Sequence, residues 1–304
     1  MIHIKDKEGE DVPFVREVLV ESLTKAGMKP WQAHSFSREI ETELIAKAAQ
    51  EIDREDFIEI VHSRLTNVNS KVAERFRAWR EIKGKDREPI IVLIGGGTGV
   101  GTTTVGTELA YRMGIKNTIS TDSIREIMRK TVSEKLLPVL HVSSYEAYKQ
   151  MKVDVGKKKG ASEAIIAGFK LQASEVSVGV EAIIERALKE GTPTLIEGLH
   201  IVPGMINEEI MKKPNVMMFI LHLKNEKEHK DRLYSRAFET KFRRSVENYV
   251  DNFKGIREIQ KFITKEAENN KVELLENKNF ELSITEIMDD VISNIVKQQK
   301  KDDA

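Results

Sequence analysis

Residues 88–103 read Glu-Pro-Ile-Ile-Val-Leu-Ile-Gly-Gly-Gly-Thr-Gly-Val-Gly-Thr-Thr. The apolar run is typical of a buried strand, and the glycine-rich turn after it lets successive backbone N–H groups converge on a phosphate without steric conflict from Cβ atoms. Helical spacing follows directly, with apolar residues at Val105, Leu109 and Met113. A strand, a glycine turn and a helix in this order predict a nucleotide triphosphate site, where the helix dipole also favours the anion.

The turn departs from the usual phosphate-loop motif at one position. That motif is Gly, four residues, Gly, Lys, and then Ser or Thr. Thr102 stands at the lysine position here, and Thr103 stands at the position of the Mg²⁺ ligand. Because transferred phosphoryl charge must be met by a cation, we expect an arginine, a metal or a monovalent ion such as K⁺ to replace the lysine. The residues expected to bind the nucleotide phosphates are Gly96, Gly97, Thr98, Gly99, Val100, Gly101, Thr102, Thr103 and Thr104.

A dinucleotide-binding turn is an alternative interpretation of these glycines. It needs glycines at the first, third and sixth positions before a helix. Counting from Gly97 places Thr102 at the sixth position, and counting from Gly95 places Val100 there, so no register fits. Asp122 would nevertheless suit a dinucleotide ribose, because it follows about 20 residues downstream. An ordinary glycine-rich turn is the other alternative.

Composition excludes several classes of protein. The 49 basic and 49 acidic residues cancel, so there is no general preference for nucleic acid or for an anionic membrane. The chain has no cysteine, which excludes disulfides, thiolate metal sites and cysteine nucleophiles. The first ten residues are rich in charge, and the longest apolar stretch, Val216 to Leu221, is too short to span a bilayer. We therefore predict a cytoplasmic protein with a small-molecule partner, and homo-oligomerisation stays open.

The pattern of residues changes near position 88. Apolar stretches at Ile2 to Ile4 and Val12 to Phe14 flank a turn at Gly9 and predict a hairpin, and the polar run Lys83 to Arg87 predicts a linker. Helical patterns cover about residues 15–26, 33–52, 55–65 and 70–82. We predict a small, mostly helical module at residues 1–88.

Short apolar strands alternate with helices from Ile90 onward, which predicts a parallel α/β sheet in residues 89–304. A long helix is expected near Ser162 to Lys189. A final helix is expected from about Ser283 to Val296, before a polar tail at Lys297 to Ala304. The five predicted strands are Ile90 to Ile94, Asn117 to Ser120, Thr194 to Glu197, Val216 to Leu223 and Val272 to Leu275.

Candidate catalytic residues follow the second and third strands of this sheet, because functional residues collect beyond the carboxyl ends of parallel strands. Asp122 could accept a proton from a substrate hydroxyl, and Arg125 could face an anionic substrate. The structural alternative is a helix N-cap at Asp122 with Arg125 solvated. Glu197 ends the third strand beside the phosphate loop and is a candidate to hold Mg²⁺ or its water. His200 could contact an anionic acceptor, although a lone histidine is more often structural.

A basic helix is expected after the fourth strand. Arg232 and Arg236 are four residues apart and share a helix face, so they could close over the transferred phosphoryl group as a mobile lid. The alternative is a solvated charged helix.

Together these stretches resemble the archaeal 2-phosphoglycerate kinases, whose phosphate loop also carries Gly-Val-Gly-Thr in place of the lysine ending. The first module resembles an ATP-cone through Lys5, the Lys7 to Gly9 turn and the helices after it. The other matching segments are Gly95 to Thr104, Ser120 to Arg125, Leu140 to Tyr145, Gly168-Phe169 with Gln172, and Ile196 to Gly204.

The resemblance implies ATP-dependent phosphorylation of 2-phosphoglycerate to 2,3-bisphosphoglycerate, a step towards cyclic 2,3-diphosphoglycerate in archaea. It also implies a kinase-type P-loop core with strand order 2-3-1-4-5. An acceptor that bears phosphate and carboxylate suits a pocket supplied with Arg125, Arg129, His200 and the lid arginines. Two alternatives remain: a kinase for another hydroxylated acceptor, such as a nucleoside or nucleotide, and a regulator that binds nucleotide without turnover.

Overall fold

The computed structural model describes residues 2–5, 11–46, 51–81, 88–151, 160–239 and 246–302. The chain divides into two compact units, each described by itself below. One unit comprises Met1–Asp86, Tyr111–Gly114 and Thr285–Ala304, and the other comprises Arg87–Ala110 and Ile115–Ile284. The domain boundary at residue 88 stays a prediction.

A three-stranded sheet opens the first unit, with order β2-β1-β3. Strand β1 (His3–Lys5) pairs antiparallel with β2 (Asp11–Pro13), which confirms the pairing of the predicted hairpin, whereas Gly9 and Lys7 lie outside the described residues. On its other side β1 pairs in parallel with β3 (Glu51–Asp53). The predicted helix over residues 33–52 is therefore wrong at its end. Pairing with a distant strand overrides the local helical spacing there.

Four helices form the rest of this module, as predicted from the apolar spacing. Their buried faces meet in one core, in which Leu23, Leu44, Leu65 and Phe76 have no exposed surface. The helices are α1 (Arg16–Lys25), α2 (Pro30–Ala46), α3 (Arg54–Val68) and α4 (Ser70–Glu81).

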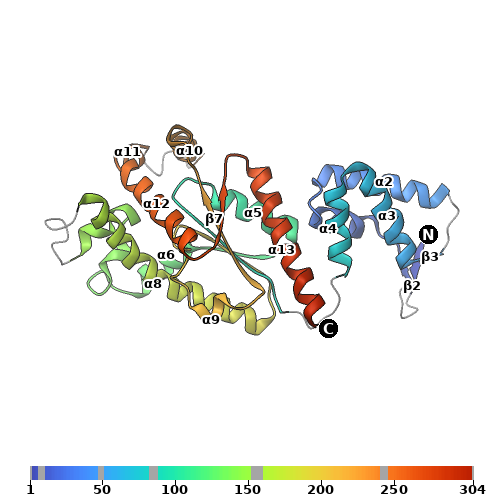
Figure 1. The fold of residues 1–304 in the computed structure, drawn as a ribbon, viewed down its shortest axis with the longest axis horizontal. Helices are drawn as coiled ribbons and strands as arrows, with labels where there is room; N and C mark the ends of the chain where they lie inside the picture. The colour runs from blue at the N-terminus through green and yellow to red at the C-terminus, as the bar shows by residue number, and fades with distance from the viewer. Residues whose placement is uncertain are drawn as a thin grey trace. The chain divides into compact units, whose positions relative to one another are not determined.

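Five parallel strands form the central sheet of the second unit (Figure 1). All five predicted strands are confirmed, and the order β5-β6-β4-β7-β8 is the expected 2-3-1-4-5 order of a P-loop kinase core. The central strand, which runs into the glycine turn, lies between its two neighbours, with Gly95 opposite Gly198 and Ile220. The strands are β4 (Ile91–Gly96), β5 (Asn117–Ser120), β6 (Thr194–Gly198), β7 (Val216–His222) and β8 (Glu273–Glu276).

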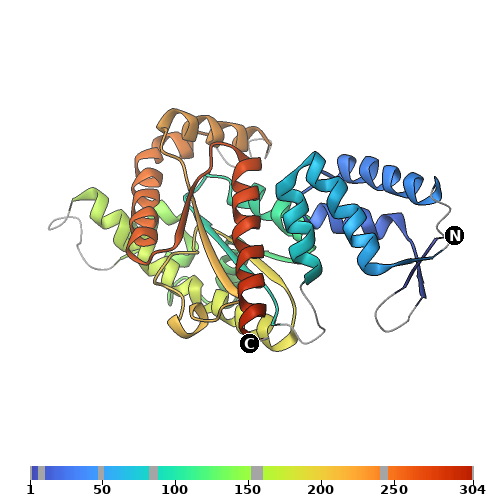
Figure 2. The ribbon, with the colours of Figure 1, turned by 45° about the vertical axis from the view of Figure 1, so that its right-hand side comes forward.

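Helices cover both faces of this sheet (Figures 1 and 2). Leu93 of β4 and Ile196 of β6 share one core with Phe169 of α8 (Ala161–Glu190) and with α12 (Phe253–Asn269). Helix α5 (Thr102–Met113) lies on the other face and buries the predicted apolar stripe that includes Val105 and Leu109. The chain therefore leaves β4, passes through the glycine turn and enters α5, as a phosphate loop requires.

The remaining elements are short except for the last helix. Helix α13 (Phe280–Asp302) extends past the predicted end near Val296, since lysine and glutamine are good helix formers. The predicted polar tail is thus helical to Asp302. Among the described helices, none is both long and apolar enough to cross a bilayer. The others are α6 (Thr121–Thr131), η1 (Pro138–His141), η2 (Ser144–Gln150), α9 (Glu208–Met211), α10 (Glu226–Glu239) and α11 (Val246–Asp251).

Candidate active site

The glycine turn has the backbone conformation of an anion-binding loop. Gly99 and Gly101 have φ values of 86° and 98°, in the left-handed region where a side chain would be strained. A Cβ atom on Gly96 would lie 2.6 Å from the carbonyl oxygen of Leu221 on β7. The positive φ values allow successive amides to face one another around a phosphate, which is the nest geometry of such loops.

Two hydroxyl groups of the α5 N-terminus meet the carboxylate of Glu197. Thr102 Oγ1 donates to Glu197 Oε2 at 2.8 Å, and Thr103 Oγ1 lies 3.1 Å from both carboxylate oxygens. Gly106 permits this approach, because a Cβ atom there would lie 3.4 Å from the Glu197 Cβ. The structure thus brings the predicted metal residues together and adds Thr102, which the motif places only at the lysine position.

The Thr103 hydroxyl and the Glu197 carboxylate suit Mg²⁺ better than they suit a metal ion whose ligands are all protein side chains. Across the described ranges there is no group of three or more His, Cys, Asp or Glu side chains able to hold a metal. Mg²⁺ keeps several waters and is commonly bound by one or two carboxylates together with substrate phosphates. One hydroxyl and one carboxylate beside a phosphate loop match that chemistry.

The exit of β5 holds Asp122 and Arg125 together. Ser120 caps helix α6, with its side chain accepting from the Ser123 amide at 3.1 Å, so the alternative of an N-cap at Asp122 is wrong. Arg125 Nη2 lies 3.8 Å from Asp122 Oδ1, and Arg125 Nη1 donates to the Val142 carbonyl at 3.0 Å. The carboxylate is half-exposed and the arginine side chain is mostly buried. An exposed carboxylate next to a fixed cation can receive a hydroxyl and an anionic group.

Arg129 lies one turn further along α6. Its Nη1 donates to Glu126 Oε2 at 2.8 Å within the same helix. The structure therefore places its guanidinium in a local ion pair, and its contact with a substrate stays a prediction.

His200 occupies a different place from the one expected, because its ring has no exposed surface. Nδ1 lies 3.1 Å from Thr121 Oγ1, and Nε2 lies 3.2 Å from Gln172 Oε1. The same Gln172 oxygen accepts from Ser144 Oγ at 2.5 Å. Burial, together with the nearby Arg125 charge, lowers the pKa of His200 to about 4. The ring is thus neutral, and its hydrogen bonds connect the turn after β6 with α6 and α8. In this conformation the enclosed ring does not reach an acceptor substrate.

Arg232 contacts the outer side of the phosphate loop. Its Nη1 donates to the Val100 carbonyl at 3.3 Å, its Nη2 donates to the Asn277 carbonyl at 2.6 Å, and the guanidinium lies 4.6 Å from the Phe280 ring centroid. The side chain is therefore held by several partners, unlike the solvated arginine of a free lid. Arg236 lies in the same helix, and its side chain falls outside the described part of the structure.

Comparison with known proteins agrees with this geometry. Residues 2–85 match the family described as ATP cone domain. A protein of Methanopyrus kandleri named 2-phosphoglycerate kinase is 37% identical over 300 residues, covering 99% of this chain and 90% of that protein. Its namesake from Methanothermobacter thermautotrophicus is 41% identical over 289 residues, covering 95% and 92%. The chain belongs to the 2-phosphoglycerate kinase family.

Members of the 2-phosphoglycerate kinase family also occur outside the methanogens, since a relative of that name from Pyrococcus furiosus is 36% identical over 303 residues. Among solved structures, a shikimate kinase from Acinetobacter baumannii in complex with shikimate is 20% identical, with a TM-score of 0.40, covering 68% of this chain and 94% of that chain. That likeness adds nothing to what the strand order already shows.

His229 and Asn277 contact the phosphate loop of this 2-phosphoglycerate kinase family member, and the sequence did not predict either contact. Both are fully buried, and each donates to a loop carbonyl oxygen. A partial signal exists for His229, because Leu233 lies four residues away on the same buried helix face. Asn277 has no such signal, since its role depends on the packing of β8 against the loop.

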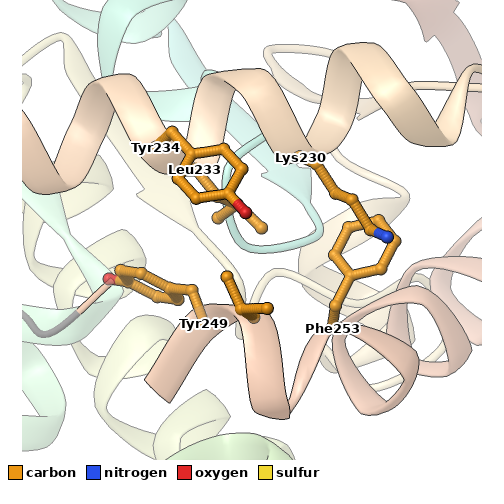
Figure 3. Close-up of a pocket in the computed structure, with 6 residues that line it drawn as sticks. Lys230, Leu233, Tyr234, Tyr249 and Phe253 are labelled. Atoms are coloured by element: carbon orange, nitrogen blue, oxygen red, sulfur yellow. The ribbon is translucent and has the colours of Figure 1, made fainter. Parts of the chain in front are cut away.

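A small apolar pocket lies where α10 packs against α11 and α12 (Figure 3). The Lys230 ammonium lies 4.8 Å from the Phe253 ring centroid, and Leu233, Tyr249 and Phe253 belong to one buried cluster. Leu233 also closes against the loop, because a Cβ atom on Gly99 would lie 2.5 Å from it. The pocket therefore marks the packing that holds α10 against the phosphate loop. Its lining residues are Lys230, Leu233, Tyr234, Tyr249, Val250 and Phe253.

Proposed function

We propose that this protein transfers the terminal phosphoryl group of ATP to the free hydroxyl group of 2-phosphoglycerate. The new bond joins the hydroxyl oxygen to the phosphorus, ADP leaves, and the hydroxyl proton passes to a base. The observation that carries the proposal is the meeting of the Thr103 hydroxyl and the Glu197 carboxylate beside the glycine turn. Membership of the 2-phosphoglycerate kinase family supports the acceptor, and the ATP-cone match supports ATP as the nucleotide.

The nucleotide end of the proposed site is the loop between β4 and α5. The amides of Gly97 to Gly101 suit the phosphate oxygens, and the N-terminus of α5 adds its dipole. Thr103 is proposed to bind Mg²⁺ directly, and Glu197 is proposed to hold it through a water. When bound, Mg²⁺ supplies positive charge to the phosphate oxygens.

The acceptor end of the proposed site is the exit of β5. Strand β6 lies between β5 and β4 in the sheet, so the acceptor residues lie on the far side of Glu197 from the loop. Gly198, with φ of 137°, lets Thr121, which follows β5, approach β6 closely, because a Cβ atom on residue 198 would lie 2.2 Å from Thr121 Oγ1. Asp122 is proposed to orient the attacking hydroxyl and accept its proton, while Arg125 pairs with the negative charge of the acceptor.

The cation that replaces the loop lysine is open to direct test. The candidates are Arg232, which already contacts the loop from outside, a metal ion such as the proposed Mg²⁺, and a monovalent ion such as K⁺. Replacing K⁺ by a large organic cation at constant ionic strength tests the monovalent ion. A loss of turnover supports the monovalent ion, and unchanged turnover supports the arginine or the metal ion.

A coupled ADP-release assay tests the proposed function. The acceptors are 2-phosphoglycerate, 3-phosphoglycerate, adenosine and AMP, and phosphorus NMR identifies the product. We expect release with 2-phosphoglycerate that matches the 2,3-bisphosphoglycerate formed, and its loss in Glu197→Gln, which controls for contaminating kinases. Faster release with another acceptor would support a different kinase, and ATP binding without acceptor-dependent release would support a regulator.

A further inference from the structure

Two fully buried side chains hold the outer side of the phosphate loop. His229 Nε2 lies 2.7 Å from the carbonyl oxygen of Thr98, and Asn277 Nδ2 donates to the carbonyl oxygen of Val100 at 2.7 Å. Arg232 adds a 3.3 Å contact to the same Val100 oxygen. Because neither His229 nor Asn277 has any exposed surface, each can act on a bound nucleotide only through the loop.

Each of these two donors has a defined orientation. His229 Nδ1 faces Arg257 Nη1 at 3.4 Å, so Nδ1 accepts and the proton lies on Nε2, the nitrogen that faces the loop. The Val100 carbonyl oxygen can only accept, which assigns the Asn277 amide nitrogen to it and leaves Oδ1 to accept from Ser283 Oγ at 3.0 Å. The chain therefore places a neutral donor against each loop carbonyl, and Arg232 adds a charged donor at the Val100 oxygen.

The direction of a carbonyl fixes the direction of the next amide. In a planar trans peptide the C=O and the following N–H point in opposite directions. The Thr98 and Val100 oxygens point outward to His229 and Asn277, so the N–H groups of the two following residues point to the inner side of the loop. Those residues are Gly99 and Gly101, the two loop glycines with positive φ.

We propose that His229 and Asn277 are positioning residues for ATP, which fix the Gly99 and Gly101 amides in the direction that binds phosphate. This inference rests on the proposed function, because it takes ATP as the ligand of the loop. Thr102 stands where the motif has lysine, so fixed amide dipoles supply a larger share of phosphate recognition here. Dipoles that are already oriented need no reorganisation when the phosphate arrives.

A matched pair of variants at one position tests the proposal in the full chain. Leucine in His229→Leu fills similar space and donates nothing, whereas glutamine in His229→Gln can place an N–H near the former Nε2. We expect the Kd for ATP, measured without acceptor, to rise roughly tenfold in His229→Leu, as for one lost hydrogen bond to a charged group. In His229→Gln the Kd for ATP should return to within about threefold of the wild-type value. The KM for 2-phosphoglycerate should stay within about twofold of wild type in both variants.

A packing control separates positioning from general destabilisation. Phe253, which lines the pocket of Figure 3, packs edge-on against His229 with ring centroids 5.6 Å apart. Phe253→Leu disturbs the same region and keeps the imidazole, so its Kd for ATP should stay within about twofold of wild type. If His229→Leu does not fold, Asn277→Ala takes its place, with the same roughly tenfold expectation.

Two results would overturn the proposal. One is a folded His229→Leu or Asn277→Ala protein that binds ATP as tightly as wild type. The other is a Phe253→Leu protein that loses ATP affinity as strongly as His229→Leu. Failure of the proposed kinase function is distinguishable, because it would be seen in the wild type as ATP binding without phosphorylation of 2-phosphoglycerate, or as no ATP binding.

Discussion

Acid should destabilise this protein in part through the buried His200, and removing that histidine should remove part of the acid sensitivity. The His200 ring is neutral in the folded state, where burial is the main cause that lowers its pKa from the ordinary 6.5 to about 4. In the unfolded chain the ring is solvated and titrates near its ordinary value. Unfolded chains therefore bind a proton between these two pH values that folded chains do not.

The sign and size of the effect follow from proton linkage. A depressed histidine pKa means that its contribution to stability is complete above pH 6.5, falls as the pH drops towards 4, and changes no further below it. One pKa unit corresponds to about 1.4 kcal/mol, so the whole contribution is about 3 kcal/mol. Between about pH 7 and about pH 4.5, His200 should account for about 2 kcal/mol of lost stability.

His200→Asn is the matched variant, because an amide can still accept from Thr121 Oγ1 but cannot titrate. It should be less stable than wild type at neutral pH, since the contact with Gln172 is lost. The free energy of unfolding is measured by urea titration with far-ultraviolet circular dichroism at several pH values. Tryptophan fluorescence would not serve, because Trp31 and Trp79, the two tryptophans, both lie in the first unit.

The difference in the free energy of unfolding between the wild type and His200→Asn should narrow by about 2 kcal/mol on acidification. Parallel losses of stability in the two proteins would refute the reasoning. So would an NMR titration in which the His200 ring protonates near pH 6.5 in the folded protein.

Three further predictions concern catalysis. Thr103→Val should lose most Mg²⁺-dependent turnover and Thr103→Ser should keep it, and an unchanged Mg²⁺ titration of the valine variant would contradict the metal assignment. Asp122→Asn should lower turnover by roughly two to four powers of ten, whereas Arg125→Ala should mainly raise the KM for 2-phosphoglycerate. If both variants instead bind ATP more weakly and keep the wild-type kinetics for 2-phosphoglycerate, the residues after β5 belong to the nucleotide site. A shortened chain that begins near Lys83 should phosphorylate the acceptor if it folds, and ATP binding without transfer by that folded chain would place part of the active site in the first module.

Strands β4 and β7 were predictable because each contains a run of apolar residues that is fully buried. Strand β3 was not, since Glu51–Asp53 is only three residues long and is defined by its pairing with β1 across 45 or more residues of chain. The spatial order of the sheet likewise came from family resemblance, because periodicity carries no information on which strands are neighbours.

The candidate site shows the same limit at the level of side chains. Motif position marks Thr103, just after β4, and Glu197, at the carboxyl end of β6, as candidates, and the structure shows that these two strands are adjacent. Spacing cannot show that Arg232 faces the outside of the loop, or that His200 is enclosed. Both outcomes depend on helices that pack from distant parts of the chain.

The position of β6 between β4 and β5 has a consequence for the evolution of specificity. The loop proposed to bind the nucleotide and the helix α6 proposed to face the acceptor follow strands that do not pair with each other. The segment after β5 should therefore be able to diversify, or be exchanged by an engineer, without a change in the backbone proposed to hold the triphosphate. Glu197 and Gly198 end the strand between these two proposed sites, so a new acceptor specificity should be reached by substitutions that leave this pair intact.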